Sequence, residues 1–406
     1  MCASSMAVFV AAMLLLVAAT PVHAEDNGLA QLPFLGWNTW STDDIAGLLD
    51  LCFEKEILEV ADAMAKYLKP LGYQYIILDD CWAAHERDEL GKLQADPKRF
   101  PNGLKPVIDH AHSLGLRFGA YTCAGTKTCK YNRPGSYGYY HEDAQTFADW
   151  GLDLVKLDNC HIPSGSNRVE LYSNFSRALN ETGRPMVFSL CEWGQGDPWK
   201  WAPQIANSWR IHEDTMPWWW GNQGTLAVIE SAAGLSQYAG PGGWNMLDIM
   251  QILVFENQWI DSKTCFSFWA LVNSPLVTGS DIRDLGWNEP KAQIIMNSDV
   301  IAVNQDPLAK AGDRIVKYED NTQVWAKDLA DGSKAIILFN PHDLEEKRVA
   351  VQWSQLGLPA NSTMDLYNLW THKEMGRHPA GFSELVWPHD VVMMRATPVE
   401  EPSSST

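Results

Sequence analysis

Two aspartates, Asp158 and Asp214, each lie at the end of an apolar, strand-like run of the sequence. Asp158 ends LDLVKLD, and Asp214 ends SWRIHED, four residues after Arg210. A pair of carboxylates on one face of a protein suits the cleavage of a glycosidic bond, in which one attacks the anomeric carbon and the other protonates the leaving oxygen. Lys156 would point to the same side of its strand as Asp158, and its positive charge is expected to help keep Asp158 ionised.

Other polar or aromatic residues also stand at the ends of apolar runs. They are Trp40, Asp79, Asp80, Tyr121, Glu192, Arg210 and Asp248. A single Asp at the end of a strand most often caps the following helix. The adjacent pair Asp79–Asp80 fits that explanation less well, because two neighbouring carboxylates repel each other and need hydrogen-bond donors, which sugar hydroxyls could supply. These residues would form one site if the strand ends meet in space.

A repeated strand–helix pattern would bring the strand ends together. Helical periodicity at Lys55–Leu71 and Asn167–Thr182 alternates with apolar runs that recur every 30–40 residues or so. The expected strands are Phe34–Trp40, Tyr73–Asp80, Arg117–Thr122, Leu152–Asp158, Pro185–Cys191, Ser208–Asp214, Gly243–Asp248 and Leu271–Asp281. Eight such units predict an α/β fold, a (β/α)8 TIM barrel, whose strand C-termini share the face that carries active sites. A doubly wound sheet would also alternate, but no G-x-G-x-x-G follows the first run.

After about Pro307 the pattern changes to short alternating runs separated by turn residues. The expected strands are Ile315–Tyr318, Thr322–Lys327, Ala335–Phe339, Arg348–Trp353, Met364–Asn368 and Val391–Arg395. They predict a C-terminal antiparallel β-sandwich domain. The expected division is a signal peptide at 1–24, the barrel at 25–308, the antiparallel domain at 309–400 and a tail at 401–406.

The first residues have the pattern of a secretory signal. An uninterrupted small and apolar run, Met6–Ala19, precedes small residues at Val22 and Ala24, which predicts cleavage after Ala24. The run is too short to span a bilayer. The mature protein is therefore expected to be secreted or to reside in a lysosomal or vacuolar lumen.

The composition narrows the class of partner. The chain has 406 residues, is 46% hydrophobic and carries a formal net charge of −19, so it has material for a large core and would repel nucleic acids and anionic membranes. Its 19 tryptophans suit flat sugar rings, although most are expected to fill the core. Neither a metal nor a cofactor is expected, because no cysteine pair has CxxC spacing and no histidines cluster with the cysteines.

The number of cysteines and the presence of N-x-S/T sequons are consistent with an exported protein. The cysteines that remain after signal removal are Cys52, Cys81, Cys123, Cys129, Cys160, Cys191 and Cys265. This odd count leaves at least one free thiol. N-x-S/T sequons at Asn174, Asn180 and Asn361 are candidate glycosylation sites.

Longer motifs surround the candidate residues. In chain order they are GWNTW (Gly36–Trp40), LGYQYIILDDCW (Leu71–Trp82), DPKRFPNG (Asp96–Gly103), AGTKTC (Ala124–Cys129), FADWGLDLVKLDNC (Phe147–Cys160), SLCEWG (Ser189–Gly194) and AGPGGWN (Ala239–Asn245). Through them, and through LWTHKEMG and PHDVVMMRATP near the C-terminus, the sequence resembles glycoside hydrolase family 27 over essentially the whole mature chain. The main members of that family are α-galactosidases.

The resemblance implies a role for each candidate residue. Asp158 would be the nucleophile and Asp214 the acid/base of a retaining exo-α-galactosidase. The implied substrate-binding residues are Asp79 and Asp80 at the 6- and 4-hydroxyls, Lys156 and Arg210 at the 3- and 2-hydroxyls, Trp40 and Tyr121 along the ring, Cys191, Glu192 and Trp193 at the 2-position, and Asp248. The implied disulfides are Cys52–Cys81 and Cys129–Cys160, and Cys191 would be free. Cys123 and Cys265 have no implied partner, and we expect two buried thiols there and not a disulfide between them.

The sequence departs from the family pattern at three places. Met246-Leu247 replaces Asp-Pro, and Ile249 replaces a Met that touches the sugar, so one side of the pocket is expected to be more apolar. Glu213 precedes Asp214 and would either raise the pKa of Asp214 or, as we favour, face away from it. The run Trp218–Trp220 would form either an outer sugar-binding wall or packing against the barrel rim.

Several specificities stay open at this point. The partner expected is a carbohydrate with terminal α-galactosyl groups, and a homodimer is not excluded. An α-N-acetylgalactosaminidase needs space where Glu192 and Trp193 are expected, and a β-L-arabinopyranosidase has no use for Asp79. A non-catalytic galactose-binding protein would usually lack one of the two catalytic carboxylates.

Overall fold

The computed structural model describes residues 27–40, 50–254, 258–286 and 289–399. The expected signal peptide at 1–24 and the tail at 401–406 lie outside these ranges. Among the described helices, none combines the length and apolar character needed to cross a membrane.

The N-terminal part is built on a parallel sheet that closes on itself. Within the described ranges its eight strands are β1 (Leu35–Asn38), β2 (Tyr75–Leu78), β3 (Arg117–Cys123), β4 (Leu154–Asp158), β5 (Val187–Cys191), β6 (Ser208–Arg210), β7 (Trp244–Met246) and β8 (Leu276–Thr278). They are hydrogen bonded in the order β7-β6-β5-β4-β3-β2-β1-β8, and a parallel bridge from Met250 to Thr278 joins the segment after β7 to β8. The expected (β/α)8 barrel is confirmed. Strands such as β2 (YIIL) are buried throughout because helices cover the sheet.

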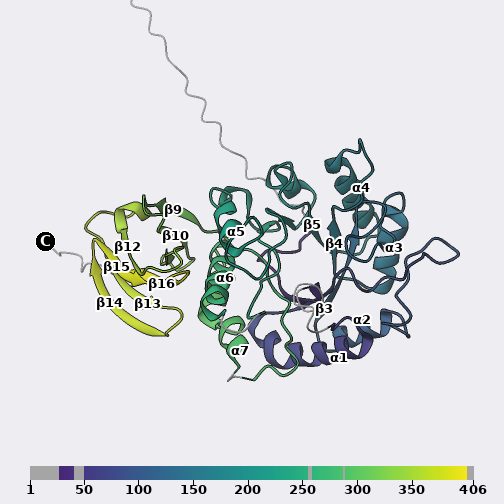
Figure 1. Cartoon of the computed structure of the whole chain (residues 1–406), viewed down its shortest axis with the longest axis horizontal. Helices are drawn as coiled ribbons and strands as arrows, with labels where there is room; N and C mark the ends of the chain where they lie inside the picture. Colours follow the sequence, from purple (N-terminus) through teal and green to yellow (C-terminus); the bar gives the residue numbers. More distant parts are fainter. Residues whose placement is uncertain (1–26, 41–49, 255–257, 287–288, 400–406) are drawn as a thin grey trace, which may run out of the picture.

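Helices surround this barrel (Figure 1). They are α1 (Glu54–Ala63), α2 (Lys105–Ser113), α3 (Tyr140–Trp150), α4 (Arg168–Glu181), α5 (Thr225–Ser231), α6 (Trp259–Leu271), α7 (Pro290–Ile295) and α8 (Ser298–Asn304). Local signals set several of their ends. The Asn167 side chain accepts a hydrogen bond from the Glu170 N–H at the start of α4, and Gly151 ends α3 in the left-handed conformation at φ 89°.

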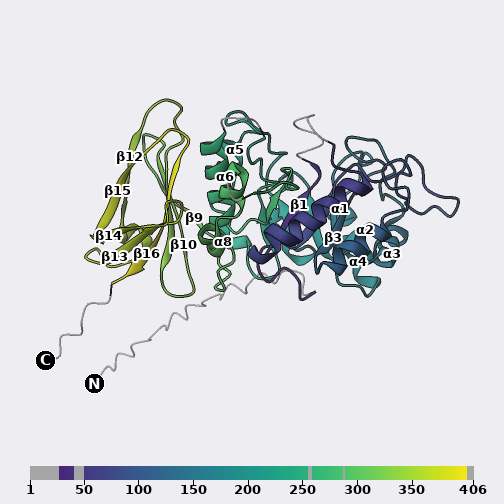
Figure 2. The same cartoon turned by 90° about the horizontal axis from the view of Figure 1, so that it is seen from below.

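The C-terminal part is antiparallel, as expected. Its strands are β9 (Asp313–Lys317), β10 (Gln323–Asp328), β11 (Lys334–Phe339), β12 (Lys347–Gln352), β13 (Thr363–Asn368), β14 (Lys373–Pro379), β15 (Gly381–Val386) and β16 (Val391–Pro398). One sheet has the order β14-β13-β16-β11-β10-β9, and β12 pairs with β15 in a second, two-stranded sheet. Figure 2 shows these strands as a separate layered unit beside the barrel.

Two of these strands, β14 and β15, are not among those expected from the sequence. β14 reads KEMGRHP and is mostly exposed at the edge of its sheet, so it lacks the apolar alternation that marks a half-buried strand. It is formed by pairing with β13, in which Met364 and Leu366 are buried.

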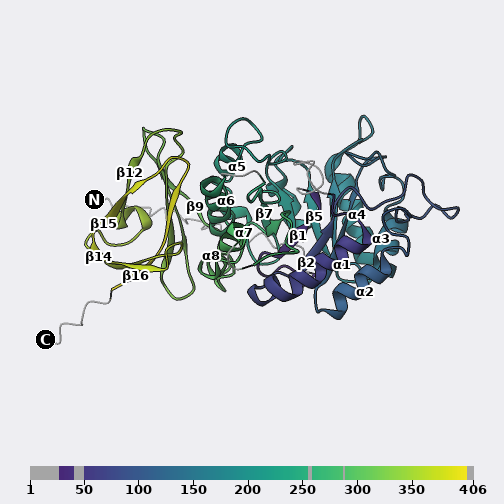
Figure 3. The same cartoon turned by 60° about the horizontal axis from the view of Figure 1, so that its bottom comes forward.

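Helices α5 and α6 lie between the barrel and the β domain (Figure 3). Helix α6 is buried on nearly all sides, because one side covers the barrel and the other meets the β domain. Phe268 of α6 packs edge-on against Trp325 of β10 and Phe339 of β11, with ring centroids 5.3 and 4.9 Å apart. One continuous hydrophobic core therefore spans both parts of the chain.

Candidate active site

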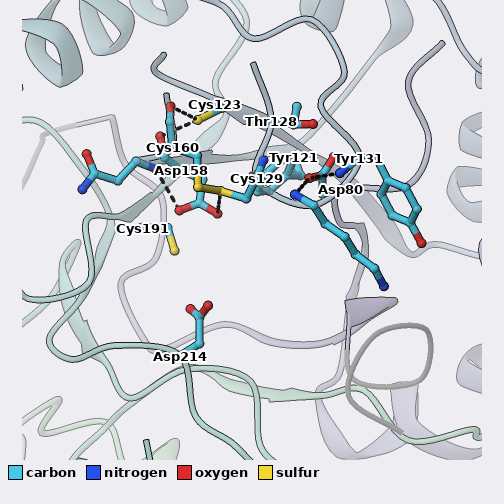
Figure 4. The surroundings of a disulfide bond; sticks show 12 residues. Asp80, Tyr121, Cys123, Thr128, Cys129, Tyr131, Asp158, Cys160, Cys191 and Asp214 are labelled. Carbon is cyan, nitrogen blue, oxygen red and sulfur yellow. Dashed lines mark hydrogen bonds between the residues drawn. A yellow bond between two sulfur atoms is a disulfide. The ribbon is translucent and has the colours of Figure 1, made fainter. Parts of the chain in front are cut away.

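The candidate residues gather at the C-terminal ends of the barrel strands. Asp158 is the last residue of β4, and it is in register with Cys123 of β3 on one side and Cys191 of β5 on the other. Asp214 follows β6, and its carboxylate faces Asp158 and Cys191 across the barrel mouth (Figure 4). The fold therefore brings together two carboxylates that are far apart in the sequence.

Asp158 is the more deeply buried of the two carboxylates. Its side chain is buried, and its Oδ1 accepts a hydrogen bond of 2.8 Å from the Asn159 N–H. Burial raises the pKa of Asp158 to about 6; the nearby Lys156 ammonium opposes this shift, and the Asp214 carboxylate adds to it. Lys156 thus favours the ionised form of Asp158, as expected, but its attraction is smaller than the cost of desolvating the charge.

Asp214 is more open to solvent, with about a third (35%) of its side chain exposed. Its Oδ1 accepts a hydrogen bond of 3.1 Å from Arg210, whose guanidinium is buried and also forms a 2.8 Å ion pair with Asp248. The second Asp248 oxygen accepts from the Thr215 N–H at 2.7 Å. Arg210 and Asp248 thus hold both the side chain of Asp214 and the backbone that follows it.

Asp79 and Asp80 follow β2, and each has its own donors. Asp79 Oδ2 accepts hydrogen bonds from Lys156 Nζ at 2.8 Å and from Asn38 Nδ2 at 2.9 Å. Burial alone would lower the pKa of Lys156, but the Asp79 carboxylate and other nearby acids raise it above its usual value, so the lysine stays charged. Asn38 was not singled out as a site residue, although it stands in the GWNTW motif.

Asp80 is held by the loop after β3. Its Oδ2 accepts hydrogen bonds from the backbone N–H groups of Lys130 at 2.7 Å and Tyr131 at 3.3 Å (Figure 4). Burial raises the pKa of Asp80, and these donors oppose the rise. The two adjacent carboxylates are therefore tolerated, because separate elements supply their hydrogen-bond donors. The backbone donors to Asp80 could not be predicted from a sequence motif.

Two disulfides support the rim, and they are the pairs that the resemblance implied. Cys52–Cys81 ties the segment before α1 to the residue after Asp80. Cys129–Cys160 joins the loop after β3 to the residue after Asn159, and the Cys129 sulfur lies 3.3 Å from Asp158 Oδ2. A disulfide sulfur carries no hydrogen, so this contact positions the carboxylate by packing.

The same loop passes very close to the segment after β4. A Cβ on Gly125 would stand 2.0 Å from the Cys160 carbonyl oxygen, so only glycine fits there. Cys123, Cys191 and Cys265 are free and buried. The Cys123 thiol donates to the carbonyl oxygens of Asp158 and Cys160, so it supports the backbone on both sides of Asn159.

Aromatic rings line the charged groups. Lys156 Nζ lies 5.3 Å from the centre of the Tyr121 ring and 5.8 Å from that of Trp40. Tyr121 is fully buried, and its hydroxyl accepts a long hydrogen bond of 3.4 Å from the Cys129 N–H. Trp40 remains partly exposed at the end of β1.

The segment Cys191–Trp193 forms another part of the wall. Glu192 is buried with its nearest cation, Arg168, at 3.6 Å, and burial raises the pKa of Glu192 to about 8 despite that cation. Trp193 adopts φ 59°, a conformation that is rare for a bulky side chain. Backbone of this kind tends to occur at functional sites, where surrounding structure holds it in place. Arg168, at the start of α4, carried no signal in the sequence.

The residues near Asp248 that differ from the family pattern lie in the hydrophobic core. Met246 and Ile249 pack inside the barrel with Phe34, Ile77 and other apolar side chains, and Leu247 belongs to the surrounding core. Met246 and Ile249 also line a small internal cavity next to Lys156 and Cys191. Their apolar character is therefore used for packing at the base of the site.

For Glu213 and for the run Trp218–Trp220, the structure distinguishes between the two positions considered from the sequence. Glu213 is exposed and accepts a hydrogen bond of 2.8 Å from Asn222, so it faces the following loop, as we favoured. Trp219 is buried and stacks on His389 of the β domain at 4.1 Å, while Trp218 and Trp220 are about half exposed. The run thus contains both kinds of residue, one for packing and two at the surface.

The sequons differ in their surroundings. Asn361 lies exposed in the turn before β13, and Asn180 is exposed near the end of α4, whereas Asn174 is half-buried within that helix. Within the described ranges no three Asp, Glu, His or Cys side chains are arranged so that they could hold a metal ion.

Comparisons with known proteins agree with this architecture. Residues 32–306 match the family described as Alpha galactosidase A, and residues 319–396 match the Alpha galactosidase C-terminal beta sandwich domain. A probable alpha-galactosidase of Dictyostelium discoideum is 38% identical over 96% of this chain and 98% of its own length.

Solved structures give the same result. The alpha-galactosidase I of Mortierella vinacea superposes with a TM-score of 0.85 at 34% identity, covering 91% of this chain and 98% of its own. The alpha-galactosidase of Saccharomyces cerevisiae with raffinose superposes with a TM-score of 0.82 at 30% identity, covering 92% and 99%. A barrel with this polar ring, joined to this β domain and matched along nearly its whole length, belongs to the α-galactosidase family, glycoside hydrolase family 27.

Proposed function

We propose that the protein hydrolyses terminal non-reducing α-D-galactosyl groups by double displacement with retention of configuration. The observation that carries this proposal is the pair Asp158 and Asp214, facing each other across the mouth of one barrel. Such a pair suits retention when its carboxyl groups are about 5–5.5 Å apart. The names of the family and of the relatives support galactosides as the substrate class.

In this proposal Asp158 attacks the anomeric carbon and Asp214 protonates the leaving oxygen. Asp214 then deprotonates the water that releases galactose from Asp158. The deeper burial of Asp158 suits a nucleophile shielded from water, and the open position of Asp214 suits a group that exchanges protons with leaving groups and water. Arg210 donates a hydrogen bond to Asp214 and would hold this carboxyl in place through both steps.

The remaining side chains would contact the hydroxyls and the ring of the sugar. Asp79 and Asp80 are held by separate donors, so their outer oxygens are preorganised to accept hydrogen bonds from the 6- and 4-hydroxyls. Lys156 and Arg210 would bind the 3- and 2-hydroxyl region, with Trp40 and Tyr121 against the ring. Cys191, Glu192 and Trp193 would border the 2-position, with Asp248 holding Arg210.

The alternative of an α-N-acetylgalactosaminidase finds less support. That activity needs space beside the 2-position, where Glu192 is buried and Trp193 is held in a constrained conformation. Hydrolysis rates on the nitrophenyl glycosides of α-galactose, N-acetyl-α-galactosamine and β-L-arabinopyranose would separate the family's specificities, and we expect the α-galactoside to be preferred.

The proposed compartment is the exterior or a lysosomal or vacuolar lumen. Two disulfides next to the site, Cys52–Cys81 and Cys129–Cys160, suit an oxidising compartment. The sequon at Asn361 lies exposed in a turn, which is accessible to glycosylation.

The test of the mechanism is the configuration of the first product. Proton NMR of fresh nitrophenyl α-galactoside hydrolysate should show α-galactose before mutarotation produces the β-anomer. Initial β-galactose would contradict the double displacement. The Asp158→Ala variant serves as the control and should release no galactose while keeping the far-UV circular dichroism of the parent.

A further inference from the structure

A groove with a volume of about 480 Å³ lies between helix α5 and the β domain, outside the site described above. Its lining from the barrel side includes Trp220, Leu226 and Glu230, and that from the β domain includes Lys317, Asn321 and Asp343. In Figure 1, α5 and β9 face each other at this boundary. The volume is in the range typical of small-ligand sites, which often lie between domains.

Trp220 gives the groove a flat apolar surface in a fixed orientation. The residue is 51% exposed, and its indole N–H donates a hydrogen bond of 2.6 Å to Asp343 Oδ1. Its ring also meets the His389 ring edge-on at 6.5 Å. Because the polar edge of the indole is bonded to the protein, the exposed part is mainly its carbon surface, and little side-chain entropy is lost when a ligand covers it.

The loop that carries Trp220 is itself anchored. Trp219 is buried, stacked on His389 and edge-on to Phe339 at 6.0 Å. Two backbone hydrogen bonds, Thr225 N–H to Trp218 O and Leu226 N–H to Trp219 O, join this loop to the start of α5. The exposed indole is therefore built into a part of the molecule that packing and backbone hydrogen bonds hold in place.

Polar side chains surround this aromatic surface and offer both donors and acceptors. Glu230 accepts hydrogen bonds from Arg314 at 2.5 Å and Lys317 at 3.0 Å, so its carboxylate is fixed and neutralised. Asn321 is an exposed turn residue at φ 64°, and Asp343 is half exposed. The whole chain has a formal charge of −19, which disfavours anionic ligands.

We propose that this groove is a second, non-catalytic carbohydrate site that binds a hexose ring of a neutral polysaccharide. The apolar face of the sugar would stack on Trp220, and its hydroxyls would bond to Asn321, Asp343 and Lys317. Trp220 is six residues after Asp214, so the two lie within about 22 Å of each other at full extension of the chain. A polysaccharide held in the groove would therefore stay close to the proposed catalytic pocket.

The test measures binding alone, so it stands whether or not the proposed hydrolysis is observed. The probe is galactomannan, cast in native polyacrylamide gels at increasing concentration. The protein carries Asp158→Asn, so that it cannot degrade the probe, and Asp80→Asn, which weakens the proposed hold of the catalytic pocket on a galactosyl group without adding a sugar that could compete for the groove. We expect the mobility to fall with galactomannan concentration, and the apparent dissociation constant to rise at least tenfold when Trp220→Ala is added.

Two further variants make the result specific. Trp387→Ala removes a tryptophan that is 59% exposed and does not line the groove, and it should bind like the parent. Asn321→Gly keeps the left-handed backbone and removes one polar partner, so it should weaken binding several-fold even if Trp220→Ala does not fold. Circular dichroism and the Tm establish that each variant is folded.

Three results would overturn the proposal. One is an electrophoretic mobility that galactomannan does not change, and another is retardation that is seen with Asp158→Asn alone and lost when Asp80→Asn is added. The third is equal retardation of the parent and of folded Trp220→Ala and Asn321→Gly. Sedimentation velocity addresses the other occupant of such a surface: if Trp220→Ala turns a dimer of the parent into monomers, the groove is an interface between copies of the chain and the carbohydrate site is refuted.

Discussion

At the residue scale, the two proposed catalytic carboxylates differ in their surroundings more than in their sequence context. Asp158 is buried between Cys123 and Cys191 and against a disulfide, whereas Asp214 is partly open and bonded to Arg210. Burial raises the pKa of Asp158 to about 6, with Lys156 acting in the opposite direction. Two predictions follow from that balance, one for activity and one for stability.

The first prediction concerns the acid limb of the pH profile. A nucleophile must be ionised, so kcat/KM should fall as pH decreases below about 6. Lys156→Met removes the cation that lowers the Asp158 pKa, and the limb should move to higher pH in addition to any general loss of activity. The profile with a nitrophenyl α-galactoside checks this, and Lys55→Met, at an exposed position of α1, is the control. A limb that stays in place would show that Lys156 does not tune the nucleophile.

The second prediction is that Asp158→Asn stabilises the protein while abolishing turnover. The folded-state pKa is raised above 3.8, so the buried charge costs stability at pH 7, by up to about 3 kcal/mol. Below about pH 4 both folded and unfolded states are protonated, and the advantage of Asn should disappear. Thermal unfolding at several pH values measures it, with the exposed Asp149→Asn as a matched control. A lower Tm at pH 7 would contradict the prediction.

At the element scale, the loop between β6 and α5 is held by the β domain. His389 bonds through one ring nitrogen to Asp261 of α6 at 2.9 Å and through the other to Asp343 at 2.8 Å, and its ring stacks on Trp219. Burial opposes the charged imidazolium, but the two carboxylates raise the pKa of His389 above its usual value. His389 therefore links both domains to the loop that follows Asp214.

We expect this link to depend on pH. Because the folded-state pKa of His389 is raised, its stabilisation is complete below the unfolded-state value of 6.5 and is lost as pH rises through the folded-state value. His389→Ala should therefore lower the Tm more at pH 5.5 than at pH 8.5. His378→Ala, on β14, is the control, because this histidine bonds to a backbone carbonyl and packs edge-on against Phe382, with no ion pair to a carboxylate among the described residues. An equal loss for His389→Ala at both pH values would refute the electrostatic link.

At the scale of the whole molecule, the barrel and the β domain share one core. Phe268, Trp325 and Phe339 meet across the boundary, and Lys327 of β10 reaches into the barrel side, where it donates to Asn273 Oδ1 at 2.5 Å and to the Val303 carbonyl at 2.6 Å. Burial lowers the pKa of Lys327 to about 8. A buried lysine whose bonds end on neutral oxygens requires a closely fitted interface.

This shared core predicts that the two domains unfold together. Phe339→Ala should lower the free energy of unfolding by about 3–5 kcal/mol, because it empties a site packed by both domains. Calorimetry should show one transition in the parent and one, at lower temperature, in the variant. Phe382→Ala, a partly buried residue of the outer β12–β15 layer, should cost less. Two separate transitions in the parent would contradict the shared core.

Much of the fold could be predicted because its signals are local. Runs rich in apolar residues at regular spacing marked the barrel strands, and the rule that parallel strand ends share one face predicted that Asp79, Asp158 and Asp214 lie together. The strand limits were less accurate: Ser208–Asp214 shortens to β6, and Leu271–Asp281 shortens to β8, with Leu271 itself the last residue of α6. Apolar character alone does not distinguish a buried strand from a buried helix end.

The sequence by itself determined the barrel, the order of its strands, the β domain and the polar ring at the strand ends. Only the tertiary structure decided the properties that depend on what packs around a residue. It raised the pKa of Asp158, placed Met246 and Ile249 in the core, and divided Trp218–Trp220 between interior and surface. The reason is physical: periodicity is set by neighbours along the chain, whereas burial and electrostatic energy are set by neighbours in space.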